Sequence, residues 1–569
     1  MARKKRPNQR RDKTEQKQWL SDKRQAGGHA EGTMIPPPGG LEDSGDASRC
    51  LESTHGGSLR AEADFRAYYE AQHLFGEGPD AASEFEAFWR VVHTPLPVTV
   101  RLSPRWESDH IRTQSRLAAS GWQRRCEFDR AGISVWQISN KKYTDQNGVR
   151  AWAERENRRG LLSFQELVSL VPALLLDPRP EDICLDMCAA PGNKSLQLLE
   201  ALERGRSDCS FAAAEYSGAV MSTDNNAQRC CLALSRVLTK AASPASCSAL
   251  LNAKEFPVLL ERSVNGDALQ SPAAQRLDLL SYTRILADVP CSGDGTARKN
   301  VHVWRSWSRK EALELHRLQR NILVRGLHLL RVGGLLAYST CSLNPVENEA
   351  VVLCALRKWQ GREDGRLELL DAHAACSNVS GLQTTPGLSH WAVPSPKRGG
   401  PLFTTWEEVP PDLQAQNGGP LRCDMFLHGD GSGCAHDDKL LAAQLQRCVR
   451  YYPQHGDTGG FFVALIRKVP SPCLVPRPFN KTAESLNAAS NSDNRTHPMV
   501  HARYTRVKPD DAAWLEIVAF LGVDATWARD RLQRGLLFWQ AIHDKQPERV
   551  TLASEGVARL WAASSASGR

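Results

Sequence analysis

Between about residues 180 and 360, the chain alternates short apolar runs with longer segments of helical periodicity. Strands linked by crossover helices give this pattern, and they form parallel sheets covered by helices. The apolar runs predict five strands, at Ile183–Met187, Gly218–Thr223, Ala249–Asn252, Arg284–Asp288 and Leu335–Thr340. A long helix is predicted from Ser308 to Leu330, with Gly333 and Gly334 ending it. We therefore expect an α/β, doubly wound, Rossmann-like domain.

Aromatic side chains recur at helical spacing ahead of this domain. They are Phe65, Tyr68 and Tyr69, followed by Phe85, Phe88 and Trp89. This pattern predicts an amphipathic helical pair, and an aromatic stripe of this kind is more often core than ligand site. We expect residues 61–179 to form an N-terminal helical region.

The remaining chain divides by composition. Residues 361–446 are rich in Gly, Pro and short polar runs, which indicates an insertion with little core of its own. A strand pair is predicted around Cys448–Pro453 and Phe461–Ile466, so that the main domain spans 180–468. Polar residues 469–499 are predicted to form a linker to a small C-terminal module at 500–569.

The composition is that of a globular protein, with 41% hydrophobic residues, and the 569-residue length favours one large domain with smaller flanking modules. Without an apolar run of about 18 residues, and with a basic, polar N-terminus, the chain is expected to be soluble and intracellular. The 16 cysteines are scattered and predict free thiols. We expect no metal site, because Cys423, His428, Cys434 and His436 lack the paired spacing of zinc ligands.

Positive charge is concentrated at the N-terminus. Residues 1–25 hold ten Lys and Arg against three acidic residues, so they carry +7 of the chain's net +8. Such an arm is typical of a nuclear-import signal or of a tail that grips nucleic acid. A solvated disordered terminus is the alternative. Gly and Pro in residues 26–60 predict a disordered linker between this arm and the body.

One candidate ligand site follows the first predicted strand, in the stretch LDMCAAPGNKS from Leu185 to Ser195. Small residues there let backbone amides approach a ligand, and the following helix N-terminus favours a carboxylate such as that of methionine. The stretch has neither the GxxxxGK spacing of a phosphate loop nor a GxGxxG pattern. Asp224, after the second strand, is placed to accept both hydroxyls of a ribose. A tight turn and a helix cap are the alternatives.

Two cysteine motifs follow the fourth and fifth strands. The first is Asp288-Val-Pro-Cys291-Ser-Gly-Asp-Gly-Thr, and the second is Ser339-Thr-Cys341-Ser-Leu-Asn-Pro. Adjacent strand ends would bring both thiols to one rim of the sheet. Lys194 would be a nearby cation that could lower a thiol pKa. For either cysteine alone, a small buried hydrophobe is the competing interpretation.

Together these stretches resemble the Sun-domain RNA (cytosine-5) methyltransferases. LDMCAAPGNK, DVPCSGDGTARKN and STCSLNPVENEAVV are similar to the cofactor and catalytic motifs of that family. Flanking segments resemble its eukaryotic tRNA branch: PLPVTVR from Pro95, GLLSFQELVSLVPALLL from Gly160 and RCVRYYPQHGDTGGFFVALIRK from Arg447. The resemblance covers about residues 60 to 470. It extends more weakly to KPDDAAWLEIVAFLG in the last module, which ends earlier than in that branch.

The resemblance implies an S-adenosylmethionine-dependent methyltransferase domain, with an N-terminal region that faces RNA. It implies Cys341 as the nucleophile, Cys291 as the thiol needed for product release, and Asp288 and Lys194 near the target base. Asn252 meets the adenine in a gapless alignment, while Asp267 is a rival after an insertion. The implied cofactor residues are Cys188, Ala189, Ala190, Pro191, Gly192, Asn193, Lys194, Asp224, Asn252 and Asp288.

The chemistry of such an enzyme requires both thiols. Carbon 5 of cytosine is too weak a nucleophile to take a methyl group, so a thiolate first adds to carbon 6. A proton donor near N3 assists this addition, and a base that removes the carbon 5 proton ends the reaction. A cytosine inside a helix is inaccessible, so the target must be unpaired or flipped out.

Alternatives remain open at this stage. A DNA cytosine-5 methyltransferase would use the Pro-Cys thiol as nucleophile, but its Glu-Asn-Val motif is absent from this chain. A non-catalytic RNA-binding scaffold would keep the fold alone. We expect tRNA as the partner, with rRNA or mRNA as alternatives, no membrane and no obligate protein partner. The nucleus, including the nucleolus, is the expected location and the cytoplasm its alternative.

Overall fold

The computed structural model describes residues 56–204, 217–241, 243–257, 259–262, 277–360, 362, 365–427, 435–471, 503–506, 537–541, 549–552 and 557. The basic arm, most of the predicted 469–499 linker and most of the C-terminal module lie outside these residues. Within the described part of the chain, no helix is long and apolar enough to cross a membrane.

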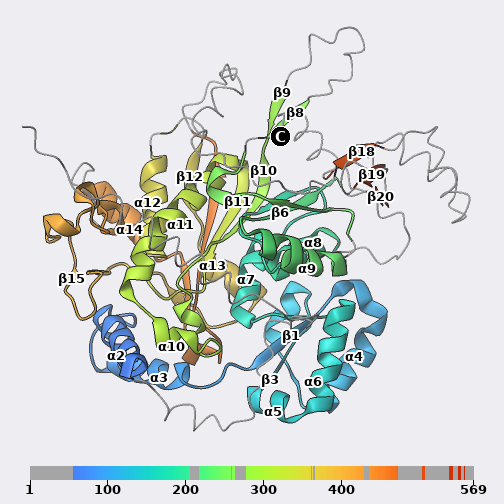
Figure 1. Ribbon diagram of the computed structural model, residues 1–569, viewed down its shortest axis with the longest axis horizontal. Helices are drawn as coiled ribbons and strands as arrows, with labels where there is room; N and C mark the ends of the chain where they lie inside the picture. Colours follow the sequence, from blue (N-terminus) through green and yellow to red (C-terminus); the bar gives the residue numbers. More distant parts are fainter. Residues whose placement is uncertain are drawn as a thin grey trace, which may run out of the picture. The chain divides into compact units, whose positions relative to one another are not determined.

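A mixed sheet forms the centre of the molecule (Figure 1). Its strands lie in the order β13-β16-β17-β11-β10-β5-β6-β7, and β12 pairs with β17 beyond this path. β5, β6, β7, β10 and β11 run parallel, whereas β17 is antiparallel to β11. The strands span Ile183–Asp186 (β5), Ala219–Asp224 (β6), Ser246–Leu250 (β7), Tyr282–Asp288 (β10), Leu330–Thr340 (β11), Arg366–Leu369 (β12), Thr385–Pro386 (β13), Val449–Tyr451 (β16) and Phe461–Val469 (β17).

Helices cover both faces of this sheet, which confirms the predicted doubly wound α/β fold. α11 and α12 pack on one face, and α7, α8, α9 and α13 pack on the other. Because successive side chains of a strand point to opposite faces, Ile183 and Leu185 join one core cluster while Cys184 joins the other. The helices span Leu167–Leu176 (α7), Asn193–Leu202 (α8), Ser235–Ala241 (α9), Arg309–Leu329 (α11), Glu349–Trp359 (α12) and Ala372–Val379 (α13).

The predicted boundaries differ from the structure most clearly at the start of β7 and between α11 and β11. β7 begins at Ser246, three residues before the predicted strand, because polar Ser246 and Ser248 pair with β6 although they carry no apolar signal. Gly333 and Gly334 do not end α11; they lie inside β11, where Gly333 has φ +86°. A Cβ on Gly334 would lie 3.0 Å from the carbonyl oxygen of Thr283, so the glycine permits a close approach of β10.

The segment 361–446 contributes to the main core. Trp391, Val393, Phe403 and Leu421 are buried in the same cluster as α11 and α12. Composition does not reveal this packing, because the apolar residues are isolated among Gly and Pro. Besides β12, α13 and β13, the segment contains Val393–Pro394 (β14), Leu402–Phe403 (β15) and Ala435–Leu445 (α14).

The predicted aromatic helical pair is confirmed as α2 (Gly56–Ala71) and α3 (Pro79–Val92). Phe65, Tyr68 and Phe88 are buried with Trp307 and Tyr452 of the main domain. The stripe is therefore core, as expected for aromatic residues at this spacing.

The rest of the N-terminal region is not purely helical, which corrects the prediction for residues 61–179. It contains a four-stranded antiparallel sheet in the order β2-β3-β1-β4. The alternation of Val98, Val100 and Leu102 is a strand signal, and Val100 and Leu102 are buried. The elements are Val98–Leu102 (β1), Gln123–Arg124 (β2), Val135–Ile138 (β3), Leu162–Phe164 (β4), Glu107–Ala119 (α4), Asn140–Asp145 (α5) and Asn147–Arg159 (α6).

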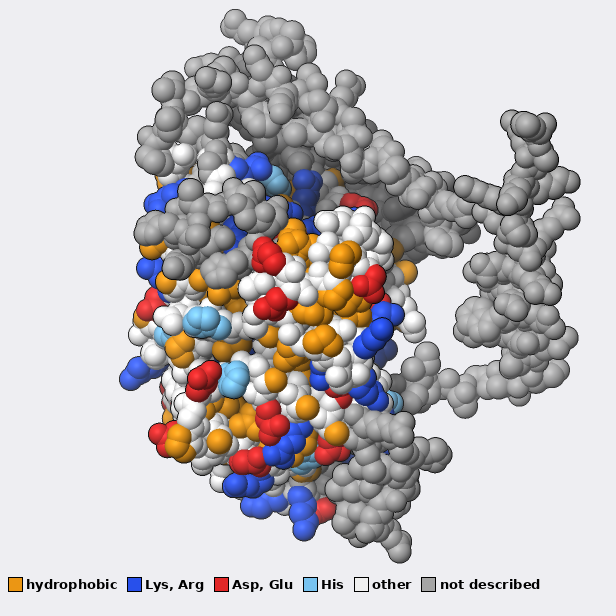
Figure 2. All heavy atoms as spheres, turned by 90° about the vertical axis from the view of Figure 1, so that its left-hand side faces the viewer, with side chains coloured by type: hydrophobic (Ala, Val, Ile, Leu, Met, Phe, Trp, Pro, Cys, Tyr) orange, Lys and Arg blue, Asp and Glu red, His pale blue; other side chains and the backbone are white. Residues whose placement is uncertain are grey.

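Several smaller elements complete the described chain. They are Leu259–Arg262 (β8), Leu277–Leu280 (β9), His302–Ser306 (α10), Arg503–Arg506 (β18), Leu537–Ala541 (β19) and Arg549–Leu552 (β20). On the face shown in Figure 2, acidic and basic side chains are interspersed with hydrophobic ones, and neither sign of charge forms a single large patch.

A buried ion pair joins β16 to α12. The guanidinium of Arg450 donates to the Glu349 carboxylate over 2.6 and 2.5 Å, and Nη1 donates to the carbonyl oxygen of Leu343 over 2.8 Å. The two side chains are 1% and 0% exposed, so the pair exists without solvent screening.

Arg450→Leu should lower the free energy of unfolding by about 3–5 kcal/mol, because it leaves the Glu349 carboxylate buried and unpaired. Urea denaturation measures the change. The control is Arg467→Leu, since Arg467 and Glu368 form an exposed pair at 3.9 Å that should contribute less than about 1 kcal/mol. Equal losses in the two variants would contradict the assigned role of the buried pair.

Candidate active site

The loop between β5 and α8 is shaped by small residues. The N–H of Ala189 donates to the carbonyl oxygen of Thr223 over 2.7 Å, which ties the loop to the end of β6. Gly192 has φ +113°, and a Cβ there would lie 3.0 Å from Leu234 and 3.1 Å from Val237. Only glycine therefore fits this left-handed turn at the start of α8.

Asp186, the last residue of β5, is buried beneath this loop. Its Oδ2 accepts a 2.6 Å hydrogen bond from the hydroxyl of Ser195, while Oδ1 has no hydrogen-bond partner among the described residues. Burial raises the pKa of Asp186 to about 7. An unpartnered acceptor at the end of a parallel strand is suited to receive a donor from a bound ligand.

Asp224 lies at the end of the neighbouring strand and is 3% exposed. Its carboxylate accepts from the N–H of Asn226 at 2.9 Å and from Arg229 at 2.8 Å, and Arg229 also donates to the carbonyl oxygen of Ala190 at 3.1 Å. A carboxylate has about four acceptor positions, so these two donors leave capacity for ribose hydroxyls.

Asn252 lies at the same edge of the sheet, two residues after β7. Its side-chain oxygen accepts from the N–H of Lys254 at 3.3 Å and caps a short helical turn. The N–H of the preceding Leu251 donates to the carbonyl oxygen of Asp224 at 3.2 Å. The rival adenine contact, Asp267, lies outside the described residues.

Lys194 and Asp288 form an ion pair between α8 and the end of β10. Lys194 Nζ lies 2.7 Å from Asp288 Oδ2 and donates to the hydroxyl of Ser169 at 2.8 Å. The other oxygen of Asp288 accepts from the hydroxyl of Ser339 at 2.7 Å. The Lys194 ammonium has three donors and therefore retains one for a substrate.

Cys291 and Cys341 meet above the ends of β10 and β11. Their sulfur atoms are 3.4 Å apart, which confirms that adjacent strand ends bring the two thiols to one rim. The hydrogen bond to Cys341 and burial raise the pKa of the Cys291 thiol well above its ordinary value. Cys291 therefore keeps its proton while it faces Cys341.

Seven of the residues predicted to bind the cofactor or the base line one cavity of 270 Å³. They are Cys188, Ala189, Ala190, Pro191, Asn193, Lys194 and Asp288, and the cavity is also lined by Phe164, Gln165, Glu166, Ser169, Asp186 and Lys299. The structure thus brings the loop of the first motif and the Lys194–Asp288 pair together. Gly192, Asp224 and Asn252 lie outside this lining, as do the two cysteines, Cys291 and Cys341.

Four residues near the cavity and the thiols had been assigned no role from the sequence. Glu166 and Lys299 form a 2.6 Å ion pair at the cavity, and the Glu166 carboxylate raises the pKa of Lys299. Asp294 and Glu347 are fully buried next to the two cysteine loops, and burial raises the pKa of both, that of Glu347 to about 7. All four lie in motifs that were recognised, but a motif does not say which segments a carboxylate joins.

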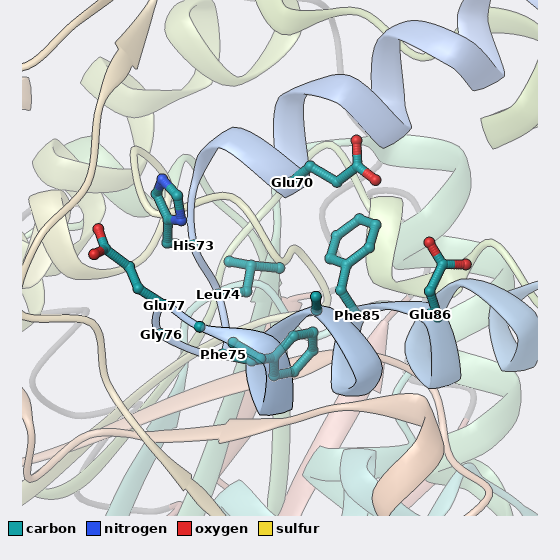
Figure 3. A pocket seen from close by; sticks show the side chains of 11 residues that line it. Glu70, His73, Leu74, Phe75, Gly76, Glu77, Phe85 and Glu86 are labelled. Atoms are coloured by element: carbon teal, nitrogen blue, oxygen red, sulfur yellow. The ribbon is translucent and has the colours of Figure 1, made fainter.

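A larger hollow of 530 Å³ lies between α2 and α3 (Figure 3). Leu74, Phe75 and Phe85 line it together with the carboxylates of Glu70 and Glu86. It contains none of the residues predicted to bind the cofactor or to act in catalysis, so it is separate from the cysteine site. Of the four residues considered for metal binding, Cys423, His428, Cys434 and His436, His428 and Cys434 lie outside the described residues.

Comparison with known proteins gives a consistent result. The family described as 16S rRNA methyltransferase RsmB/F matches residues 173–404. The multisite-specific tRNA:(cytosine-C(5))-methyltransferase trm4b of Schizosaccharomyces pombe is 31% identical over 515 residues, covering 82% of this chain and 71% of that protein.

Two further relatives match over shorter shares of their length. The multisite-specific tRNA:(cytosine-C(5))-methyltransferase of Saccharomyces cerevisiae is 33% identical, covering 71% of this chain and 54% of that protein. The tRNA (cytosine(34)-C(5))-methyltransferase of Drosophila melanogaster is 37% identical, covering 55% of this chain and 38% of that protein. The family predicted from the motifs is thereby confirmed: the chain belongs to the RsmB/F family of S-adenosylmethionine-dependent RNA (cytosine-5) methyltransferases.

Proposed function

We propose that this enzyme forms 5-methylcytosine in tRNA through a covalent bond between Cys341 and carbon 6 of the target base. The observation that carries the proposal is the 3.4 Å approach of two thiols at the ends of adjacent strands, next to the Lys194–Asp288 pair. A thiol pair beside a charged donor pair is the set of groups that addition and elimination at cytosine require.

The residues of the first motif fit S-adenosylmethionine. The Gly192 turn keeps the backbone of the loop open, the free acceptor of Asp186 lies beneath it, and Asp224 offers acceptors at the end of β6. We assign the ribose hydroxyls to Asp224 and the adenine to Asn252. When bound, S-adenosylmethionine supplies the methyl group.

The addition step uses Cys341 as a thiolate. Its sulfur forms a bond to carbon 6 while the Lys194–Asp288 pair delivers a proton to N3, which makes carbon 5 electron-rich enough to accept the methyl group. In the elimination step, Cys291 takes the proton from carbon 5 and the pair takes back the N3 proton. The carbon 5–carbon 6 double bond re-forms and Cys341 leaves.

The contact between the thiols gives the two steps an order. Cys291 stays protonated because it is hydrogen-bonded to Cys341 and because a charge on Cys341 opposes a second charge. Once Cys341 is bonded to carbon 6, that charge is gone, and Cys291 can lose its proton to solvent and act as a thiolate base. Cys291, which stays protonated during the addition step, therefore becomes the base in the elimination step.

The names of the three relatives support tRNA as the substrate class. The description of the matching family as a 16S rRNA methyltransferase supports rRNA as the second candidate. Methyl transfer from labelled cofactor to purified tRNA and to purified rRNA discriminates between them. Preferential labelling of rRNA would move the proposal to the second class.

We also propose that residues 1–25 direct the enzyme to the nucleus and add to its affinity for tRNA. The support is their charge of +7 in a chain whose net charge is +8. Clustered Lys and Arg bind phosphates and import receptors through charge, with little dependence on tertiary structure.

Asp224→Ala should weaken binding of S-adenosylmethionine by about 1.5–3 kcal/mol, since it removes a charged acceptor from the ribose hydroxyls. This corresponds to about a 10- to 150-fold rise in Kd, measured by calorimetry. Asp412→Ala, an exposed acidic residue outside the cavity, is the control. An unchanged Kd in Asp224→Ala would place the ribose elsewhere.

Cys341→Ala should abolish both methyl transfer and any RNA–protein adduct, because no bond to carbon 6 can form. Cys291→Ala should instead accumulate methylated RNA still bonded to Cys341, visible as a slow band on a denaturing gel. The double variant should lose that band. The opposite assignment of roles follows if Cys341→Ala gives the trapped adduct and Cys291→Ala gives none.

Deleting residues 1–25 should shift a fluorescent fusion from nucleus to cytoplasm and flatten the salt dependence of tRNA binding. A full-length variant with the ten basic residues of this segment changed to Gln is the control for chain length. It should reproduce the effects of the deletion. If neither variant changes location or salt dependence, the arm contributes neither function.

A further inference from the structure

Glu347 lies beneath both cysteine loops and hydrogen-bonds to each. Its Oε1 accepts from the N–H of Ser292 and from Gln319, both at 2.9 Å. Its Oε2 accepts from the hydroxyls of Ser292 at 2.5 Å and Ser342 at 2.6 Å. Ser292 follows Cys291 and Ser342 follows Cys341, so one carboxylate connects the neighbours of the two thiols.

Glu347 is itself held rigidly. The residue is 0% exposed, and its carbonyl oxygen accepts a 2.5 Å hydrogen bond from the hydroxyl of Tyr338 in β11. Gln319, which donates to the carboxylate, also donates to the carbonyl oxygen of Pro290 at 2.9 Å. Both carboxylate oxygens of Glu347 are engaged, and a buried carboxylate held by four donors fixes the geometry of the groups that it joins.

The Cys341 loop has several anchors that do not involve Glu347. The N–H of Gly295 donates to the carbonyl oxygen of Cys341 at 3.0 Å, and Asn348 donates to that of Ser342 at 2.8 Å. Asp294 accepts from the N–H of Leu343 at 2.7 Å. Loss of Glu347 would therefore leave Cys341 close to its present position.

The Cys291 loop depends more heavily on Glu347. The N–H of Val289 donates to the carbonyl oxygen of Ser339 at 3.1 Å and holds the start of this loop without Glu347. Nearer the thiol, the N–H of Ser292 donates to Glu347, and the carbonyl oxygen of Pro290 accepts from Gln319. Both bonds belong to the same network. Loss of the Glu347 side chain would therefore release the Cys291 thiol from its place against Cys341.

We propose that Glu347 is a positioning residue for Cys291, which keeps its thiol against the Cys341 adduct so that the methylated RNA is released. This inference rests on the proposed function. Glu347 acts here through hydrogen bonds to Ser292 and Gln319 and does not itself exchange protons with the substrate. It therefore affects elimination more than addition.

The test measures the lifetime of the adduct with bulk tRNA from cells that lack this enzyme. Glu347→Ala should lengthen the lifetime about 10-fold or more, because misplacement of a catalytic group by about 1 Å costs up to about 100-fold. Single-turnover methyl transfer should fall by less than about 3-fold, since Cys341 retains its other anchors. A purely structural role would slow both steps alike.

Glu347→Gln distinguishes position from charge. Its amide oxygen can still accept from Ser292 N–H and Gln319, and the serine hydroxyls can turn to accept from the amide nitrogen. Release should therefore stay within about 3-fold of wild type. Slow release in Glu347→Gln that equals Glu347→Ala would overturn the positioning role and indicate a role for the charge.

Two further variants complete the test. Glu156→Ala removes a buried carboxylate that pairs with Arg159 in α6, so it controls for a general loss of stability and should leave adduct lifetime unchanged.

If Glu347→Ala does not fold, Ser292→Ala tests the inference instead. It removes the hydroxyl that donates to Glu347 and should lengthen the adduct lifetime measurably. Normal release in both Glu347→Ala and Ser292→Ala, with wild type active, would overturn the inference. Inactive wild type on tRNA would instead overturn the proposed function.

Discussion

The parallel pairing of β10 with β11 places Asp288 opposite Ser339, and the arrangement of the site depends on this register. Cys291 lies three residues after Asp288, and Cys341 lies two residues after Ser339. The two cysteine loops therefore leave the sheet at the same level. The 2.7 Å bond from Ser339 to Asp288 connects the register directly to the ion pair with Lys194. A slip of one residue would turn every side chain of β11 to the other face.

Buried carboxylates hold the segments beyond these strand ends. Asp294, Glu347 and Glu349 are at most 1% exposed, and each accepts hydrogen bonds from chain segments that are distant in sequence. Asp294 binds Tyr69 of α2 and the N–H of Leu343, and Glu349 binds Arg450 of β16. Burying a charge is costly unless its partners satisfy it. The loops therefore keep their conformation only while all the contributing segments are in place.

The sequence was sufficient for the parts of the fold that follow a simple period. Apolar runs predicted the parallel strands, and the aromatic spacing predicted α2 and α3. Adjacent strand ends also predicted the approach of Cys291 and Cys341. The short alternation at Val98–Leu102 was missed because it is brief, and β7 was misplaced because Ser246 and Ser248 carry no apolar signal.

Contacts between segments that are distant along the chain could not be predicted from the sequence. Glu347 joins two loops and Glu349 pairs with Arg450, but the two glutamates stand two residues apart in one motif, and the sequence does not distinguish their roles. Glu166 precedes β5 and Lys299 follows β10, so they are 133 residues apart in the sequence, yet they form an ion pair at 2.6 Å. The topology of the fold determines which charged side chains meet. The motifs therefore identified the segments of the site but not the bonds between them.

The participation of α2 and α7 in the site limits how the protein can be divided. A fragment beginning at residue 180 would retain every side chain assigned to the chemistry. It would lack Tyr69, which binds Asp294, as well as Glu166 and Ser169, which bind Lys299 and Lys194. The smallest fragment that keeps these contacts therefore has to begin before α2, so the Rossmann-like domain alone is not a self-contained catalytic unit.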